Sequence, residues 1–299
     1  MDANDPLQDD KKPFCVPVEL FESITDTLTR IRKVRERPLF VLIVDDIDGK
    51  VLEDIYSWRK GLREAGRSGG FDVLIHSSGG TLSDCYLAAR LFCRCADSWK
   101  ALVPKRAVSG ATLICLGSSQ ITMCETAQLG PLDPQVLSRR REKFFASERQ
   151  SPLEAFQAVR YLREYTIATL DSIMIFLLER KVAAKVSLET ATKLAADVSR
   201  PILEKIDPYD LGSFDLDSQV AIEYCKRVGN PSTETKQTQR NVDPDRLVEA
   251  FPAHEFVIDF EEARSLGFSV ELPSDGLNEL FDKLRPDLAN AEKYIGLIA

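Results

Sequence analysis

The chain has 299 residues, of which 44% are hydrophobic, and a formal net charge of -8. This composition supplies enough apolar residues for one large or two modest folded domains. The excess of acidic residues argues against general affinity for nucleic acid or for anionic membranes. No stretch approaches the roughly 20 uncharged apolar residues of a membrane span, and the first residues are acidic and polar. We therefore expect a cytoplasmic protein.

The seven cysteines are not arranged like a disulfide framework or a zinc site. Their number is odd, no C-x-x-C pair occurs, and the chain offers only two histidines as further ligands. Several of the cysteines lie inside apolar periodic segments, where a reduced thiol packs as a small hydrophobic group. We therefore expect buried free thiols, and neither a metal nor a cofactor.

Up to about Gln135, short apolar runs alternate with segments of helical periodicity. After a disordered arm at 1–14, helices are expected at 19–33, 45–66, 81–96 and directly after Ser109, and strands at 39–44, 71–76, 100–104 and 120–124. The runs LFVLIV and FDVLIH are continuous, which is typical of strands covered on both faces. Alternating strands and helices with short connections predict an α/β fold with a mostly parallel sheet.

The pattern changes after that point to long, charged helical segments. A polar, turn-rich stretch at 229–245 precedes a final strand, short helix and return strand. The predicted division is an N-terminal arm and helix (1–36), the first part of the core (37–137), a helical insertion (138–232), the last part of the core (245–273) and a partly helical C-terminal tail (274–299).

Two segments place groups that can do chemistry between a strand and a helix. In IHSSGGT, Gly79 and Gly80 let backbone N–H groups approach a ligand, although a plain tight turn explains them as well. In VSGAT, Ser109 stands where a helix begins, so it is either a small packing residue or a nucleophile. Its neighbours do not form a G-x-S-x-G motif, because positions 107 and 111 are alanines.

The order of the motifs resembles the serine dehydrogenase proteinase family, a branch of the Clp-fold serine peptidases related to signal-peptide-peptidase A. The similar stretches are VLIHSSGGT, VPKRAVSGATLICLGSSQITMCETAQLGPLDPQ, ILEKIDPYDLGSFDLDSQVAIEYCKRV and PAHEFVIDFEEARSLGFSV. They cover roughly residues 37–272. The resemblance implies a ClpP/crotonase-type superhelical ββα core that carries the helical insertion.

The resemblance also implies a site and an activity. Ser109 matches the nucleophile of the family, and Gly79, Gly80 and the N–H of Gly110 match its oxyanion hole. The implied activity is that of a serine endopeptidase, which hydrolyses peptide bonds of a peptide or unfolded protein through an acyl-enzyme. Clp folds assemble into rings or stacks, so the resemblance further implies a homo-oligomer.

The general base is the point at which the chain departs from the Clp pattern. Where the Clp protease has a histidine, this chain has LGPLDPQV, with Asp133, and His254 aligns with the Clp aspartate. We expect His254 and Asp133 to face Ser109 with exchanged roles, since a triad is defined by geometry and not by chain order. Asp133 could instead form a turn, and His254 could be structural.

Other bases and other functions remain open. His76 is interpreted as a buried or loop-anchoring histidine, and a Ser-Lys dyad would have to use Lys105 or Lys143, which do not match the spacing in signal-peptide-peptidase A. The missing histidine also permits a catalytically inactive scaffold or binding protein. A crotonase-type enzyme acting on acyl thioesters would use the same oxyanion N–H groups without a serine.

Overall fold

The computed structural model describes residues 18–133, 136–137, 149–150, 152–204, 207–229, 241–290 and 293–298. The expected disordered arm, Gln135 and Lys143 lie outside the described residues. The chain divides into two compact units. The first comprises residues 1–132, 221–251 and 255–299, and the second comprises 133–220 and 252–254.

A six-stranded sheet forms the centre of the first unit. Its strands, in spatial order, are β10 (Lys293–Ile298), β1 (Leu39–Val44), β2 (Phe71–His76), β3 (Trp99–Val103), β5 (Gln120–Met123) and β9 (Val270–Glu271). Every neighbouring pair is parallel except β10 and β1, which run antiparallel. The strands β1 and β2 are buried along their whole length, as their unbroken apolar sequences require.

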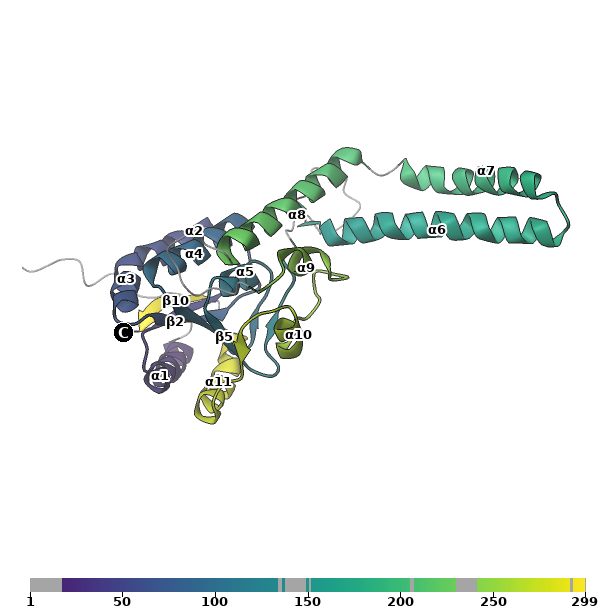
Figure 1. Ribbon diagram of the computed structural model, residues 1–299. Coiled ribbons are helices and arrows are strands. Elements are labelled where there is room, and N and C mark those ends of the chain that lie inside the picture. The colour runs from purple at the N-terminus through teal and green to yellow at the C-terminus, as the bar shows by residue number, and fades with distance from the viewer. Residues whose placement is uncertain are drawn as a thin grey trace, which may run out of the picture. The chain divides into compact units, whose positions relative to one another are not determined.

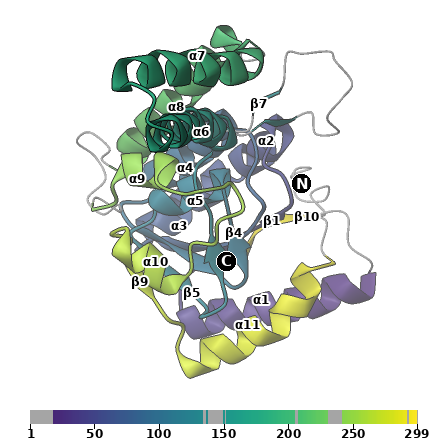
Figure 2. The same ribbon diagram turned by 90° about the vertical axis from the view of Figure 1, so that its right-hand side faces the viewer.

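Helices cover both faces of this sheet (Figures 1 and 2). One face carries α1 (Val18–Arg35) and α11 (Asp275–Leu288), which pack against each other. The other face carries α2 (Gly49–Ser57), α3 (Arg59–Arg67), α4 (Leu82–Cys95) and α5 (Gly110–Leu116). The core beneath α4 is aromatic: the Phe92 ring lies 5.5 Å from Phe40 and 5.3 Å from Trp99.

Beyond the ends of the main strands, the chain forms a second, smaller layer of short strands and bridges. Strand β4 (Arg106–Ala107) pairs in parallel with β6 (Gln128–Leu129). Isolated bridges join Ser77 to Ala107 and Leu129 to Ile258. Helices α9 (Pro244–Glu249) and α10 (Phe260–Ser265) lie in the same unit. This layer holds the segments around Ser109 in fixed register.

The second unit is largely a helical hairpin of α6 (Pro152–Glu179) and α7 (Ala184–Leu203). The hydroxyls of Thr166 and Ser199 hydrogen-bond between the two helices at 2.7 Å. The same unit contains the short antiparallel pair β7 (Val136–Leu137) and β8 (Arg149–Gln150). Helix α8 (Pro208–Gly229) runs through the boundary at residue 220, so part of it belongs to each unit.

The structure confirms the predicted α/β class, with a central sheet and a separate helical segment. Six cysteines in the described part of the chain are free and buried, as expected, while Cys15 lies outside it. The C-terminal tail is partly helical, as expected, through α11, but it also contains a strand that was not predicted. Its last segment is β10, an edge strand that pairs with β1, so the chain end is part of the main sheet.

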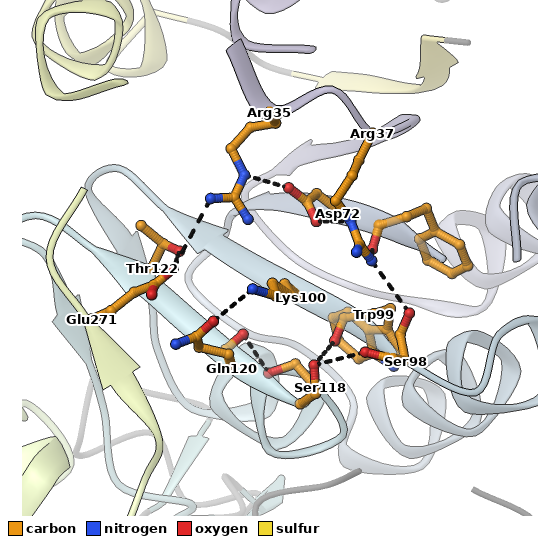
Figure 3. Close-up of polar contacts among 12 residues, drawn as sticks. Arg35, Arg37, Asp72, Ser98, Trp99, Lys100, Ser118, Gln120, Thr122 and Glu271 are labelled. Atoms are coloured by element: carbon orange, nitrogen blue, oxygen red, sulfur yellow. Dashed lines mark hydrogen bonds and ion pairs between the residues drawn. The ribbon is translucent and has the colours of Figure 1, made fainter. Parts of the chain in front are cut away.

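A network of charged groups lies near the beginnings of β2 and β3 (Figure 3). Asp72 is completely buried, and its Oδ2 accepts a hydrogen bond from Nε of Arg35 at 2.6 Å. Its Oδ1 forms an ion pair with Nε of Arg37 at 2.9 Å. Arg37 also donates to the carbonyls of Phe71 and Ser98. The network therefore ties the turn between α1 and β1 to the beginnings of β2 and β3.

Replacing Asp72 should strongly destabilise the first unit. In Asp72→Ala two guanidinium groups lose their buried counter-charge, which should lower the free energy of unfolding by about 3 kcal/mol. Asp26→Ala is the control, because Asp26 forms an exposed ion pair with Arg30 at 3.9 Å. This substitution should lower the free energy of unfolding by less than about 1 kcal/mol. Urea denaturation measures both variants, and equal losses would contradict this role for Asp72.

Candidate active site

Two chain segments meet where β2 and β4 end. The backbone N–H of Ser77 donates to the carbonyl of Arg106 at 3.2 Å, and the N–H of Val108 donates back to Ser77 at 3.2 Å. The loop after β2 is thereby fixed against the turn that leads from β4 through Ser109 into α5. Carboxyl ends of parallel strands are where open α/β sheets place their ligands.

Ser109 has a strained backbone. Its φ is 52° and its ψ is -124°, a region that only glycine occupies without strain. Its side chain makes no capping hydrogen bond to α5, and its hydroxyl has no hydrogen-bond partner among the described residues. A strained serine between a strand and a helix, with an uncommitted hydroxyl, has the local geometry of a nucleophile elbow. Alanines at positions 107 and 111 occupy the places where the elbow motif has glycines.

Glycine backbones enclose Ser109 on several sides. A methyl group added at Gly79 would lie 2.8 Å from Cβ of Ser109 and 3.1 Å from the backbone N of Gly110. A methyl group at Gly130 would lie 3.2 Å from the backbone N of Ser109. Gly79 also has a φ of +113°, so both sterics and conformation require glycine there. Glycines occupy these positions because the three segments contact one another through their backbones.

The N–H groups beside Ser109 are available to different degrees. Those of Gly80 and Gly110 have no acceptor among the residues that the structure describes. The N–H of Gly79 donates to the hydroxyl of Ser77 at 3.1 Å. Gly110 is the first residue of α5, so its N–H has no acceptor within the helix. The structure thus brings the three expected glycines together around Ser109.

Thr112 fixes the position of α5, a role that the sequence did not reveal. Its hydroxyl lies 2.9 Å from the carbonyls of Ala107 and Gly130, and accepts from the N–H of Gly130 at 3.0 Å. Thr112 is completely buried, so these bonds are made without competition from water. A single hydroxyl therefore joins α5, β4 and the segment after β6. Only the clustering of small residues around Ser109 hinted at such close packing.

Asp133 and His254 form a pair in the second unit. Nδ1 of His254 lies 3.4 Å from Oδ2 of Asp133, whose carboxylate is only 1% exposed. Both residues lie four positions from an isolated antiparallel bridge between Leu129 and Ile258. The two residues are 121 positions apart in the sequence, so no local pattern signals this contact.

His76 and Lys105 lie elsewhere in the first unit, where both line a cavity at the ends of β1 and β2. Burial, followed by the positive charges of Arg106 and Lys105, lowers the pKa of His76 to about 4. His76 is therefore uncharged at neutral pH. Among the described side chains, no group of three His, Cys, Asp or Glu residues is arranged to hold a metal ion.

Residues 37–155, which include Ser109 and its glycines, match the family model described as ClpP-like SDH-type serine proteinase. The match covers less than half of the chain, so it shows a similarity of this segment to that family. The resemblance inferred from the motifs is thus confirmed. An uncharacterized protein of Methanocaldococcus jannaschii is 37% identical over 86 residues, which are 28% of this chain and 30% of that protein. The chain therefore matches less than a third of that relative's length.

Two solved structures of the 1510-N membrane-bound stomatin-specific protease also match. A serine-to-alanine mutant matches at 15% identity and a TM-score of 0.30, over 52% of this chain and 70% of the other. A lysine-to-alanine mutant in complex with a substrate peptide matches at 14% identity and a TM-score of 0.29, over 82% and 98%. Likenesses this weak support no conclusion about this chain. None of its described helices is both long and apolar enough to cross a membrane.

The strain at Ser109 should be measurable as stability. Ser109→Gly relieves the unfavourable φ, whereas Ser109→Ala keeps it, so the glycine variant should be more stable by about 1 kcal/mol. Ser57, which ends α2 with helical geometry, is the control, and there alanine should be more stable than glycine by about 0.5 kcal/mol or more. Thermal and urea unfolding of the four variants test this reversal, and the same order at both sites would contradict it.

Proposed function

We propose that this chain is a serine peptidase that hydrolyses peptide bonds through an acyl-enzyme on Ser109. The observation that carries the proposal is the strained turn at Ser109, with its uncommitted hydroxyl, inside the segment that matches a serine proteinase family. Strain of this kind costs of order 1–3 kcal/mol and persists where the surrounding structure enforces it. A purely structural serine would gain nothing from such a conformation.

The glycine backbones supply the proposed oxyanion hole. The N–H of Gly110 and an N–H of the Gly79–Gly80 loop would donate to the oxygen that becomes negative when Ser109 attacks a carbonyl. The position of Gly79 against Ser109 and the lack of an acceptor for the N–H groups of Gly80 and Gly110 among the described residues support this assignment. Preorganised donors of this kind typically contribute 10²–10³-fold each to the rate.

His254 is the proposed general base and Asp133 its orienting carboxylate. The contact between Nδ1 of His254 and Asp133 leaves Nε2 as the nitrogen that can take up a proton. The assignment is further supported by the sequence, because both residues stand in stretches that resemble the peptidase family.

The proposed reaction has two halves. Oγ of Ser109 attacks the carbonyl carbon of the peptide bond while its proton passes to Nε2 of His254. The tetrahedral intermediate then expels the amine, which receives that proton, and an ester remains on Ser109. A water molecule gives a proton to His254 and attacks the ester, which releases the acid and restores the hydroxyl. The substrate would be a peptide or an unfolded protein; a homo-oligomer and a cytoplasmic location stay predictions.

A fluorophosphonate probe, with peptide mass spectrometry, tests the nucleophile and the base. Ser109 should be labelled in the parent chain, and Ser109→Ala should abolish the label. His254→Ala should slow labelling by about 10²–10⁴-fold, because proton transfer is lost. Asp26→Ala, which removes only an exposed ion pair with Arg30, is the control and should leave the rate unchanged. Absence of label at Ser109 in the folded protein over a series of pH values would favour the inactive scaffold.

Two glycines provide a matched test of the oxyanion region. Gly79→Ala and Gly69→Ala both place a side chain at a positive φ, +113° and +109°, so both variants carry similar backbone strain. Only at Gly79 does the new methyl group meet Ser109, since nothing lies within 4 Å of the corresponding position at Gly69. Labelling of Ser109 should fall about 100-fold or more in Gly79→Ala and stay unchanged in Gly69→Ala. Equal effects would show that general strain is responsible.

A further inference from the structure

A polar cavity of about 420 Å³ lies in the first unit, beside the carboxyl ends of β1 and β2. Asp45, His76, Lys105 and Arg106 line it, together with the C-terminal end of α11. The proposed catalytic mechanism uses none of these side chains. A cavity of this size can enclose a carboxylate together with the short side chain or chain end that carries it.

The charges around the cavity are not balanced. Arg106 pairs with Asp45 through one Nη2 contact of 3.1 Å, and the same carboxylate oxygen accepts from the hydroxyl of Ser78 at 2.7 Å. The ammonium group of Lys105 makes no ion pair or hydrogen bond with the described residues. With His76 uncharged, two cations and one anion leave a net charge of about +1 to meet a ligand.

His76 adds an unpaired buried polar atom to this site. Its side chain is only 5% exposed, and its Nδ1 is buried without a hydrogen-bond partner among the described residues. The Nε atom of Arg106 is in the same condition. Buried polar atoms are nearly always hydrogen-bonded, so two such atoms at one cationic cavity point to a missing acceptor or donor from a ligand.

We infer that this cavity is an anion subsite, which takes a carboxylate group of the peptide whose cleavage at Ser109 is proposed above. The guanidinium of Arg106 and the ammonium of Lys105 match the charge of a carboxylate, and the imidazole of His76 can donate to it or accept a shared proton. The inference rests on the proposed function, because the carboxylate belongs to the peptide substrate of the proposed reaction.

The chain places the subsite close to the nucleophile. Arg106 precedes Ser109 by three residues, and His76 precedes Gly79 by three residues, along segments that pair with each other at Ser77 and Ala107. An extended peptide also rises about 3.3 Å per residue. The carboxylate would therefore belong to a residue about three positions from the cleaved bond, either as a chain end or as an acidic side chain.

Occupancy should be visible at His76. Burial and the charges of Arg106 and Lys105 keep its pKa near 4, while Asp45 and a backbone hydrogen bond to Leu288 act in the opposite direction. A bound carboxylate adds a negative charge that favours the imidazolium form and raises the pKa of His76. By linkage, the carboxylate should then bind more tightly as the pH falls.

Imidazole NMR of the full chain carrying His254→Asn makes this measurement, because His76 is then the only histidine. The probes are a short acetylated peptide with a free C-terminal carboxylate, its C-terminal amide, an amidated peptide with one internal glutamate, and its glutamine counterpart. We expect the carboxylate-bearing members of the two pairs to shift the His76 signals and raise its pKa by about one unit. Which of the two does so identifies the chain end or the side chain as the source.

Lys105→Gln should weaken this binding about tenfold, since a charged hydrogen bond is lost. Lys100→Gln is the matched control, because the ammonium group of Lys100 donates to Gln120 at 2.7 Å (Figure 3). This variant should leave binding unchanged. Equal shifts from the amide and glutamine peptides would overturn the subsite, and so would inorganic phosphate binding where neither carboxylate peptide does.

Failure of the subsite and failure of the peptidase are separable. Carboxylate binding at His76 with no fluorophosphonate label on Ser109 would retain the subsite and reject the acyl-enzyme. Labelling of Ser109 without any response of His76 to either carboxylate peptide would reject the subsite alone.

Discussion

The close approach of three backbones at Ser109 is the constraint on which the rest of the candidate site depends. Gly79 and Gly130 press against the turn from separate segments, and neither position tolerates a methyl group without displacing it. Thr112 then fixes the segment after β6 to α5 through its buried hydroxyl. Because these contacts over-determine the turn, Ser109 is held in a conformation that a serine would otherwise leave. Strain, glycine content and the uncommitted hydroxyl are consequences of one packing arrangement.

The ion pairs that stabilise the sheet and the polar groups of the candidate site lie at opposite ends of the same strands. Asp72 lies near the beginning of β2, where it binds two arginines, whereas His76 is the last residue of that strand and lines the cavity. The parallel arrangement of β1, β2, β3 and β5 causes this separation, because all their carboxyl ends reach one edge. The ion pairs of Asp72 can therefore hold the beginnings of the strands together, while the polar groups that line the cavity at the other end stay available for a ligand.

Local sequence patterns were enough to predict the strands β1, β2, β3 and β5 and the place of Ser109 at the start of a helix. Continuous apolar runs and a helix start with small residues are local signals. The strand β10 was missed because KYIGLI becomes an edge strand only through pairing with β1, more than 240 residues earlier. The sequence suggested that Asp133 and His254 act together only through the family resemblance, because 121 positions separate them along the chain. The positive φ of Ser109 has no signal in the sequence, because tertiary packing and not serine's own preference imposes it.

The two histidines have neighbours of opposite charge, and this difference argues for different roles. His254 contacts a buried carboxylate, which can orient the ring and compensate the positive charge that a base acquires when it takes up a proton. His76 faces Arg106 and Lys105, which together with burial keep it neutral until about pH 4. A neutral imidazole among cations cannot serve as a base that must hold a proton during turnover, because its protonated form is too unfavourable. The same environment suits a group in an anion subsite, because His76 would become charged only when an anion binds. The charges around the two histidines, and not the residue type, therefore distinguish the proposed base from the proposed subsite residue.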